Sequence, residues 1–239
     1  MSLRYAAASD SGPQRTANED SLRTLPELGL FIVADGMGGH VAGEVASRIA
    51  SDAVVHVVRS TESPDRIRDE AERLGEALIA CNQAVLREAD RLNLAGMGTT
   101  LTALLVRGST VTMAHVGDTR AYLVLPEELR QLTKDHTLVN LLVDSGAIEL
   151  REVATHPERH VLTQAIGTQS SVQPDVIQLR VSPESRILLS SDGLHDVVPP
   201  DRIHELASAP ELDAIPQSLI AAANQLGGPD NITAILVEP

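Results

Sequence analysis

Short apolar runs recur along the chain and predict β-strands. They are rich in Val, Ile, Leu and Thr, and Gly, Asp or Pro residues interrupt them. Short turns join several neighbouring runs, at Pro26-Glu27, Gly108-Ser109 and Gly117-Asp118, which favours antiparallel hairpins over crossover connections. We therefore expect mainly antiparallel sheets, with strands at residues 3–9, 19–25, 28–34, 100–107, 110–116, 119–125, 174–181, 186–190 and 231–237.

Apolar residues at spacings of three and four predict helices between these groups of strands. The first long helix covers about residues 42–59; the second opens at Ser63-Pro64, with Ser as N-cap and Pro as the first helical residue, and continues to Leu92. Because each helix has one apolar face to bury, pairs of helices covering two packed sheets would satisfy every apolar face. Shorter helices are expected at residues 136–144, with Asp135 as N-cap, 199–208 and 211–226.

Composition and charge exclude several classes of protein. The 19 basic and 33 acidic residues give a net charge of −14, and the sequence contains no block of Lys and Arg that could bind along a nucleic-acid backbone. A nucleic-acid-binding protein is therefore not expected. Cys81 is the single cysteine, so no disulfide forms within the chain, and we expect it to be a small buried hydrophobe. Without a leader-like apolar segment or a run approaching roughly 18 apolar residues, the 239 residues predict one soluble, cytoplasmic domain.

Acidic residues gather at the ends of the predicted strands. Asp35 follows the run LGLFIVA and Asp192 follows SRILLSS; either Asp-Gly pair alone is ordinary turn chemistry. Strand pairing favours a shared acidic site over two separate turns. If residues 19–25 and 28–34 form a hairpin about Pro26-Glu27, residue 20 falls opposite residue 33 or 34, which places Glu19 and Asp20 beside Asp35.

Two more acids extend this cluster. Asp230 begins the run NITAILV, whose start would meet the ends of residues 28–34 or 186–190 in an antiparallel sheet, and Asp118 lies at the turn after VTMAHV. Converging carboxylates repel one another and raise one another's pKa, a cost that divalent cations remove. Oxygen ligands suit Mg²⁺ or Mn²⁺, whereas Zn²⁺ usually recruits His or Cys.

Such a site predicts phosphoryl chemistry. Two ions bridged by an aspartate and a water could generate a nucleophile and neutralise a phosphoryl group during in-line displacement. Arg15, four residues before Glu19, could supply a planar fork for phosphate oxygens, although alone it would be a solvated turn residue. Residues 145–167 are irregular and suit a mobile loop over such a site.

The acidic motifs resemble those of a known family. In order they are RTANED (15–20), FIVADGMGGHVAGE (31–44), GTT (98–100), HVGDTRAY (115–122), LTKDH (132–136), LLSSDGLHDV (188–197) and GPDNIT (228–233). Their order and spacing resemble type 2C protein phosphatases, the PPM family, in the compact bacterial form. The resemblance covers essentially the whole chain. It implies an α+β fold, a four-layer αββα sandwich of two mainly antiparallel sheets flanked by helix pairs, and hydrolysis of phosphoserine and phosphothreonine by a metal-bridging water.

The resemblance also implies a role for each motif residue. Asp35 would bridge two Mn²⁺ or Mg²⁺ ions with the Gly36 carbonyl completing one shell, and Asp192 and Asp230 would bind the second ion. Glu19 and Asp20 would act through metal-bound waters, and Arg15 would hold the substrate phosphate. The residues expected at a third, weaker ion are Asp118, Asp192 and Asp196, and residues 145–167 would be the flap that shapes access for substrate.

One position departs from the pattern of animal relatives. They carry a His, a proposed general acid, where this chain has Met37. The leaving alkoxide must then take its proton from a metal-bound water or another group; His40 is close in sequence but equally suits a role at the helix entry. His136 is expected to be a structural hydrogen-bonding residue, and His115 a core residue.

Three functions remain open. A protein phosphatase would act on phosphoserine and phosphothreonine proteins, with a cognate kinase as a further partner, and we expect a monomer. A divalent-metal enzyme acting on small phosphoesters has the same motifs. A phosphatase-like binding module would have lost some of Asp35, Asp192 and Asp230, and this chain retains all three.

Overall fold

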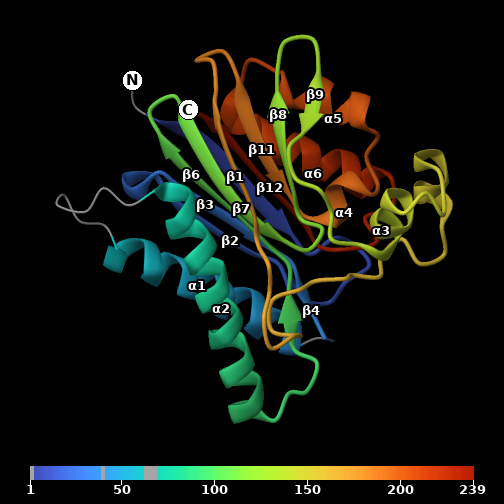
Figure 1. Cartoon of the computed structure of the whole chain (residues 1–239). Helices are drawn as coiled ribbons and strands as arrows, with labels where there is room; N and C mark the ends of the chain where they lie inside the picture. Colours follow the sequence, from blue (N-terminus) through green and yellow to red (C-terminus); the bar gives the residue numbers. More distant parts are fainter. Residues whose placement is uncertain (1–2, 39–40, 62–68) are drawn as a thin grey trace.

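Two five-stranded antiparallel sheets pack face to face in the centre of the molecule (Figure 1). The computed structural model describes residues 3–38, 41–61 and 69–239. The first sheet has the order β1 (Arg4–Asp10), β12 (Ile232–Glu238), β11 (Arg186–Ser190), β8 (Arg120–Val124) and β9 (Leu129–Gln131). The second has the order β10 (Asp175–Arg180), β7 (Thr110–Val116), β6 (Leu101–Arg107), β3 (Leu30–Ala34) and β2 (Ser21–Leu25).

Helices cover the outer face of each sheet. The long helices α1 (Val41–Thr61) and α2 (Glu70–Leu92) lie on the second sheet, while α4 (Asp192–His195), α5 (Pro200–Ala207) and α6 (Ile215–Gln225) lie on the first (Figure 1). A shorter helix, α3 (Leu138–Asp144), and the 3₁₀ helix η2 (Leu150–Thr155) stand at one end. This arrangement confirms the predicted four-layer sandwich.

Strand β3 shows how the sequence specifies the layers. Its residues are all buried, because both faces of the strand are covered. Leu30 and Ile32 belong to the core beneath α1 and α2, whereas Phe31 and Val33 belong to the core between the sheets. Alternate side chains of a strand point to opposite faces, so a continuous apolar run fills two cores at once.

Several predicted boundaries need correction. The described part of α2 begins at Glu70 with Asp69 as its N-cap, and the predicted start at Ser63-Pro64 lies outside the described residues. Thr137 caps α3, because its side chain accepts a hydrogen bond from the Asn140 N–H; Asp135 is instead ion-paired with Arg120 at 2.6 Å. The prediction of Asp135 as N-cap was therefore wrong.

The predicted hairpin register was also wrong, by one or two residues. A 3₁₀ turn, η1 (Pro26–Leu28), and Gly29 in the left-handed region connect β2 to β3, so the loop is longer than Pro26-Glu27 alone. Ser21 pairs with Ala34, which places Asp20 level with Asp35. Asp20 and Asp35 still lie beside each other, because both strands end at the same edge of the sheet.

Three short elements were not predicted from the sequence. The two-residue strands β4 (Gly36–Met37) and β5 (Gly98–Thr99) pair with each other, and α4 contains four residues; each is too short to produce a hydrophobic period. None of the helices in the described part of the chain combines the length and the apolar composition that a membrane span requires.

Two histidines behave as predicted. His115 is fully buried in β7, where its Nδ1 lies 2.9 Å from the Thr102 hydroxyl. His136 accepts a hydrogen bond at its ring Nδ1 from the Gly117 N–H, and the backbone N–H of His136 donates to the Gly117 carbonyl. His136 thereby braces the turn that carries Asp118.

Candidate active site

Strand ends from both sheets bring the acids together. Asp35 directly follows β3, and Asp118 lies in the turn between β7 and β8. Asp192 opens α4 just after β11, and Asp230 precedes β12; these two strands are antiparallel, with Ser190 opposite Ala234. Of the two pairings considered for the Asp230 strand, the structure selects the one with residues 186–190.

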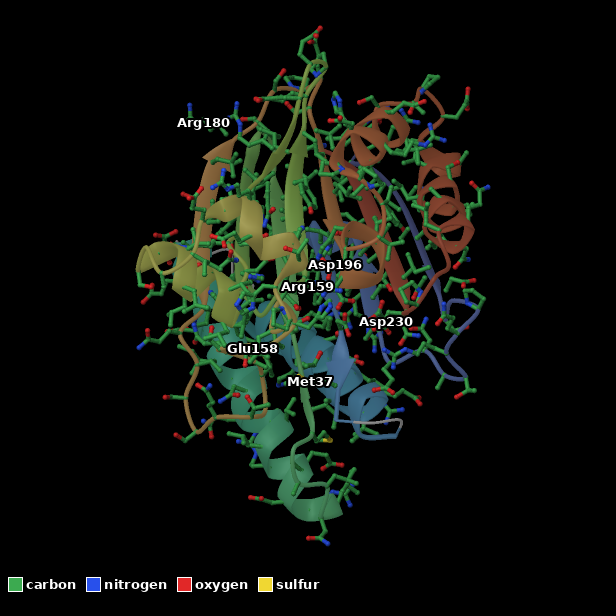
Figure 2. The ribbon with its side chains drawn as sticks, turned by 90° about the vertical axis from the view of Figure 1, so that its right-hand side faces the viewer. Met37, Glu158, Arg159, Arg180, Asp196 and Asp230 are labelled. Carbon is green, nitrogen blue, oxygen red and sulfur yellow. The ribbon has the colours of Figure 1, made fainter. Side chains whose placement is uncertain are left out.

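A cavity of about 270 Å³ opens at this end of the sandwich. Seven of the nine predicted site residues line it: Arg15, Glu19, Asp35, Gly36, Asp118, Asp192 and Asp230. Asp196 lines a neighbouring cavity; Asp20 lines neither cavity and accepts a hydrogen bond from Ser191, the residue before Asp192. Figure 2 looks toward this end of the molecule, with Met37, Asp196 and Asp230 labelled. Met37 also lines the first cavity, and His40 lies outside the described residues.

Asp20 is held from the first sheet. The hydroxyls of Ser191 and Thr233 donate hydrogen bonds of 2.8 and 2.6 Å to its Oδ2. Its Oδ1 is buried and has no hydrogen-bond partner among the described residues. Burial raises the pKa of Asp20 to about 7, reinforced by the charges of Asp192 and Asp230 and opposed by the two hydroxyl groups.

The neighbouring carboxyl groups also have raised pKa values. Burial, and then the negative charge of Asp192, raises the pKa of Asp35 well above its usual value. Burial together with the charge of Asp230 raises the pKa of Asp192 to about 6. Asp118 has its pKa raised by burial and again by Asp192.

These observations fit a divalent-cation site. Like Asp20, Asp192 has a buried Oδ1 without a hydrogen-bond partner in the described part of the chain. Buried carboxylate oxygens are expensive to leave unpaired, and mutual repulsion adds to the cost. Because the converging donors are oxygens, the set suits Mg²⁺ or Mn²⁺.

Arg15 points into the acidic cluster from the segment between β1 and β2. Its Nη2 lies 2.6 Å from Asp230 Oδ2, and its Nε donates to the Pro229 carbonyl at 3.2 Å. Half of its side chain remains exposed to solvent. The guanidinium therefore lies at the cavity mouth, where an incoming anion can reach it.

The protein phosphatase 2C family model matches residues 14–226. The chain belongs to the protein phosphatase 2C family. It is 42% identical over 238 residues to the serine/threonine protein phosphatase PstP of Mycobacterium tuberculosis (strain ATCC 25618 / H37Rv), covering 99% of this chain and 45% of that protein. The chain thus spans less than half the length of that relative. It is 37% identical to the serine/threonine phosphatase Stp of Listeria monocytogenes serotype 4b, covering 96% of this chain and 93% of that one.

Solved structures of this phosphatase family share the fold. The crystal structure of M. tuberculosis PstP/Ppp superposes with a TM-score of 0.91 at 40% identity and covers 100% of this chain and 99% of that one. The PstP catalytic domain in complex with two manganese ions gives a TM-score of 0.87 at 38% identity, covering 99% and 97% of the two chains.

Sequence reasoning missed two residues of this phosphatase 2C site. His160, from the predicted flap, lines the cavity and offers a ligand atom that lies, together with one from Asp192 and one from Asp196, within a 4.8 Å cluster. Asn231, inside the motif GPDNIT, binds the backbone of the segment before β2. An irregular loop gave no signal for His160, whereas the position of Asn231 beside Asp230 could have indicated a role.

Glycines in the motifs allow close approach. A Cβ atom on Gly43 would lie 1.8 Å from Glu19 Oε2, and one on Gly193 would lie 2.1 Å from the Asn231 carbonyl oxygen. The Gly at each position therefore lets a helix begin directly against the acidic cluster.

Proposed function

We propose that the chain is a metal-dependent serine/threonine protein phosphatase, which hydrolyses phosphoserine and phosphothreonine in proteins with Mn²⁺ or Mg²⁺ as cofactor. The observation that carries the proposal is the convergence of carboxylates around one cavity. The Oδ1 atoms of the cavity residue Asp192 and of nearby Asp20 are buried and have no hydrogen-bond partner among the residues that the structure describes. Family membership supports the reaction class, and the two manganese ions named for PstP support the cofactor.

The proposed ligand set follows the cavity lining. Asp35 and the Gly36 carbonyl would hold one ion, and Asp192 and Asp230 the other, with Asp35 between them. Glu19 and Asp20 would act through intervening waters. Asp118, Asp192 and Asp196 would hold a third, weaker ion. Bound divalent ions supply Lewis acidity, lowering the pKa of water and neutralising phosphoryl charge.

Side chains of the protein would bind the substrate phosphate and position the residue that binds it. Arg15 would bind phosphate oxygens with its planar fork, exchanging its contact with Asp230 for the substrate. Asn231 would hold the Arg15 segment in place. Met37 carries no acidic proton, so the leaving alkoxide would be protonated by a water or by another group.

The remaining sequence predictions belong to this proposal. One catalytic domain over residues 1–239, with a flap at about 145–167, is supported by the packing of both sheets on a common core and by His160 and Leu162 in the cavity lining. Bacterial relatives support a role in bacterial phosphoprotein signalling. A cytoplasmic location, a monomeric state and a cognate kinase are further parts of the proposal, which cell fractionation, sedimentation and substrate trapping would test.

Phosphate release decides between the candidate functions. A phosphothreonine peptide and a small aryl phosphate are each incubated with the protein in Mn²⁺, in Mg²⁺ and in chelator, with Asp35→Asn as the inactive control. We expect metal-dependent release from the peptide and loss of that release in the variant. Release from the aryl phosphate alone would favour a small-phosphoester enzyme, and release from neither would favour a binding module.

A further inference from the structure

A second cavity, of about 390 Å³, adjoins the catalytic cavity. Asp118 and His160 line both cavities, so the two share a wall. The second cavity lies between the predicted flap and the first sheet with its helices. Its lining also includes Leu150, Val153, Ala154, Arg159, Asp196 and Pro200.

The charged groups at the base of this second cavity already have partners. Arg120 donates from Nε to both Asp135 oxygens at 3.0 Å and from Nη2 to Oδ2 at 2.6 Å. Gln131 Nε2 donates to Asp135 Oδ1 at 3.0 Å. The other charged residues of the cavity are Asp118 and Asp196, toward the catalytic cavity, and Arg159, on the predicted flap.

The part of the flap side formed by η2 is apolar and open to solvent, and Arg159 and His160 complete that side. Leu150, at the start of η2, is 74% exposed, and Val153 and Ala154 follow on the same short helix. Pro200 faces the cavity from α5. An exposed leucine in isolation needs no explanation, but several apolar side chains around one concave surface are typical of a binding site.

We propose that this second cavity binds an apolar side chain of the phosphoprotein substrate, within three residues of the phosphorylated one; this inference rests on the proposed phosphatase function. Consecutive Cα atoms lie about 3.8 Å apart, so a peptide whose phosphate occupies the catalytic cavity extends directly over the shared wall. The apolar side chains of η2, together with Pro200, favour an aliphatic side chain over a charged one in that part of the cavity.

The test uses a phosphothreonine peptide with leucine at the three positions on either side. Each leucine is replaced in turn by asparagine, which is polar, uncharged and similar in size, and kcat/KM is measured beside that for a small aryl phosphate, which is too short to reach the second cavity. We expect one replacement to lower kcat/KM roughly ten-fold in the parent protein, the scale of discrimination that an apolar pocket provides.

Two variants of the flap region make the result specific. Leu150→Asp places a charge on the cavity wall and should abolish the preference for leucine. Leu141→Asp is the matched control, because Leu141 is also an exposed leucine, at 58%, on the neighbouring helix α3 but does not line the cavity. The control should retain both the preference and the parent's ratio of peptide to aryl phosphate turnover.

Three outcomes would overturn the inference. The parent could turn over every peptide equally, or Leu150→Asp could retain the full preference. Equal loss in both leucine variants would indicate a general disturbance of the flap instead of a side-chain pocket. Absence of release from the peptides and from the aryl phosphate would contradict the proposed function itself, and the role of the second cavity with it.

Discussion

Replacing Asn231 with alanine tests how the protein positions its phosphate-binding segment. The Asn231 side chain is 5% exposed; its Oδ1 accepts a hydrogen bond of 2.7 Å from the Glu19 N–H, and its Nδ2 donates to the carbonyls of Ser11 and Ala17 at 2.9 Å each. A hydrogen bond of this kind contributes about 0.5–1.5 kcal/mol net. Loss of all three should lower the free energy of unfolding by about 2–4 kcal/mol.

The same change should weaken phosphate binding. Arg15 lies between the two anchored carbonyls, so without Asn231 its backbone loses the contacts that fix it beside Asp230. The carboxylates that would bind metal remain in place. We expect KM for an aryl phosphate to rise roughly ten-fold, with a similar weakening of inhibition by free phosphate and a smaller change in kcat.

Urea denaturation and steady-state kinetics measure both effects. Asn82→Ala is the matched control, because the Asn82 side chain is also buried, accepts from the Gly167 N–H at 2.7 Å and donates to the Gln169 carbonyl at 3.0 Å, but lines neither cavity. The control should lose stability and keep its phosphate inhibition constant. Equal KM and phosphate inhibition in Asn231→Ala and the parent would refute the positioning role.

Three further predictions follow from the same cavity. Arg15→Ala should raise KM and weaken inhibition by free phosphate while calorimetry still detects the central ions; unchanged phosphate inhibition would place the substrate phosphate elsewhere. Asp118→Ala should lose the weakest ion and most turnover while retaining the central pair; the same number of bound ions with a lower Tm would make Asp118 a turn residue. In chelator, thermal stability should fall from pH 5 to pH 8, because the pKa values of Asp20 (about 7) and Asp192 (about 6) are raised in the folded state and deprotonation therefore disfavours folding. Addition of Mn²⁺ should restore the stability at pH 8. A Tm that rises with pH in chelator would contradict this prediction.

The strands and the convergence of acids were predictable because their signals are local. Apolar runs ending in Asp mark Asp35 and Asp192, and antiparallel pairing then brings their strand ends together. The hairpin register was not predictable, because a 3₁₀ turn at Pro26–Leu28 and a left-handed Gly29 lengthen the loop without changing its composition.

The flap side of the site was not predictable for a different reason. His160 reaches Asp192 and Asp196 through an irregular segment, and tertiary packing alone determines its place. The pairing of Asp135 with Arg120 likewise depends on adjacent strands and loops, whereas sequence proximity suggested a helix cap. Long-range contacts of single side chains carry no periodic signal along the chain.

The most direct test of the proposed metal-dependent reaction is a Mn²⁺ titration of the chelated protein, followed both by calorimetry and by phosphate release from a phosphothreonine peptide. The parent should bind at least two ions, and turnover should rise as they bind. Asp192→Asn should remain folded, bind fewer ions and lose several orders of magnitude in turnover. Turnover close to that of the parent in Asp192→Asn at moderate Mn²⁺, or full parent activity in chelator, would contradict the account.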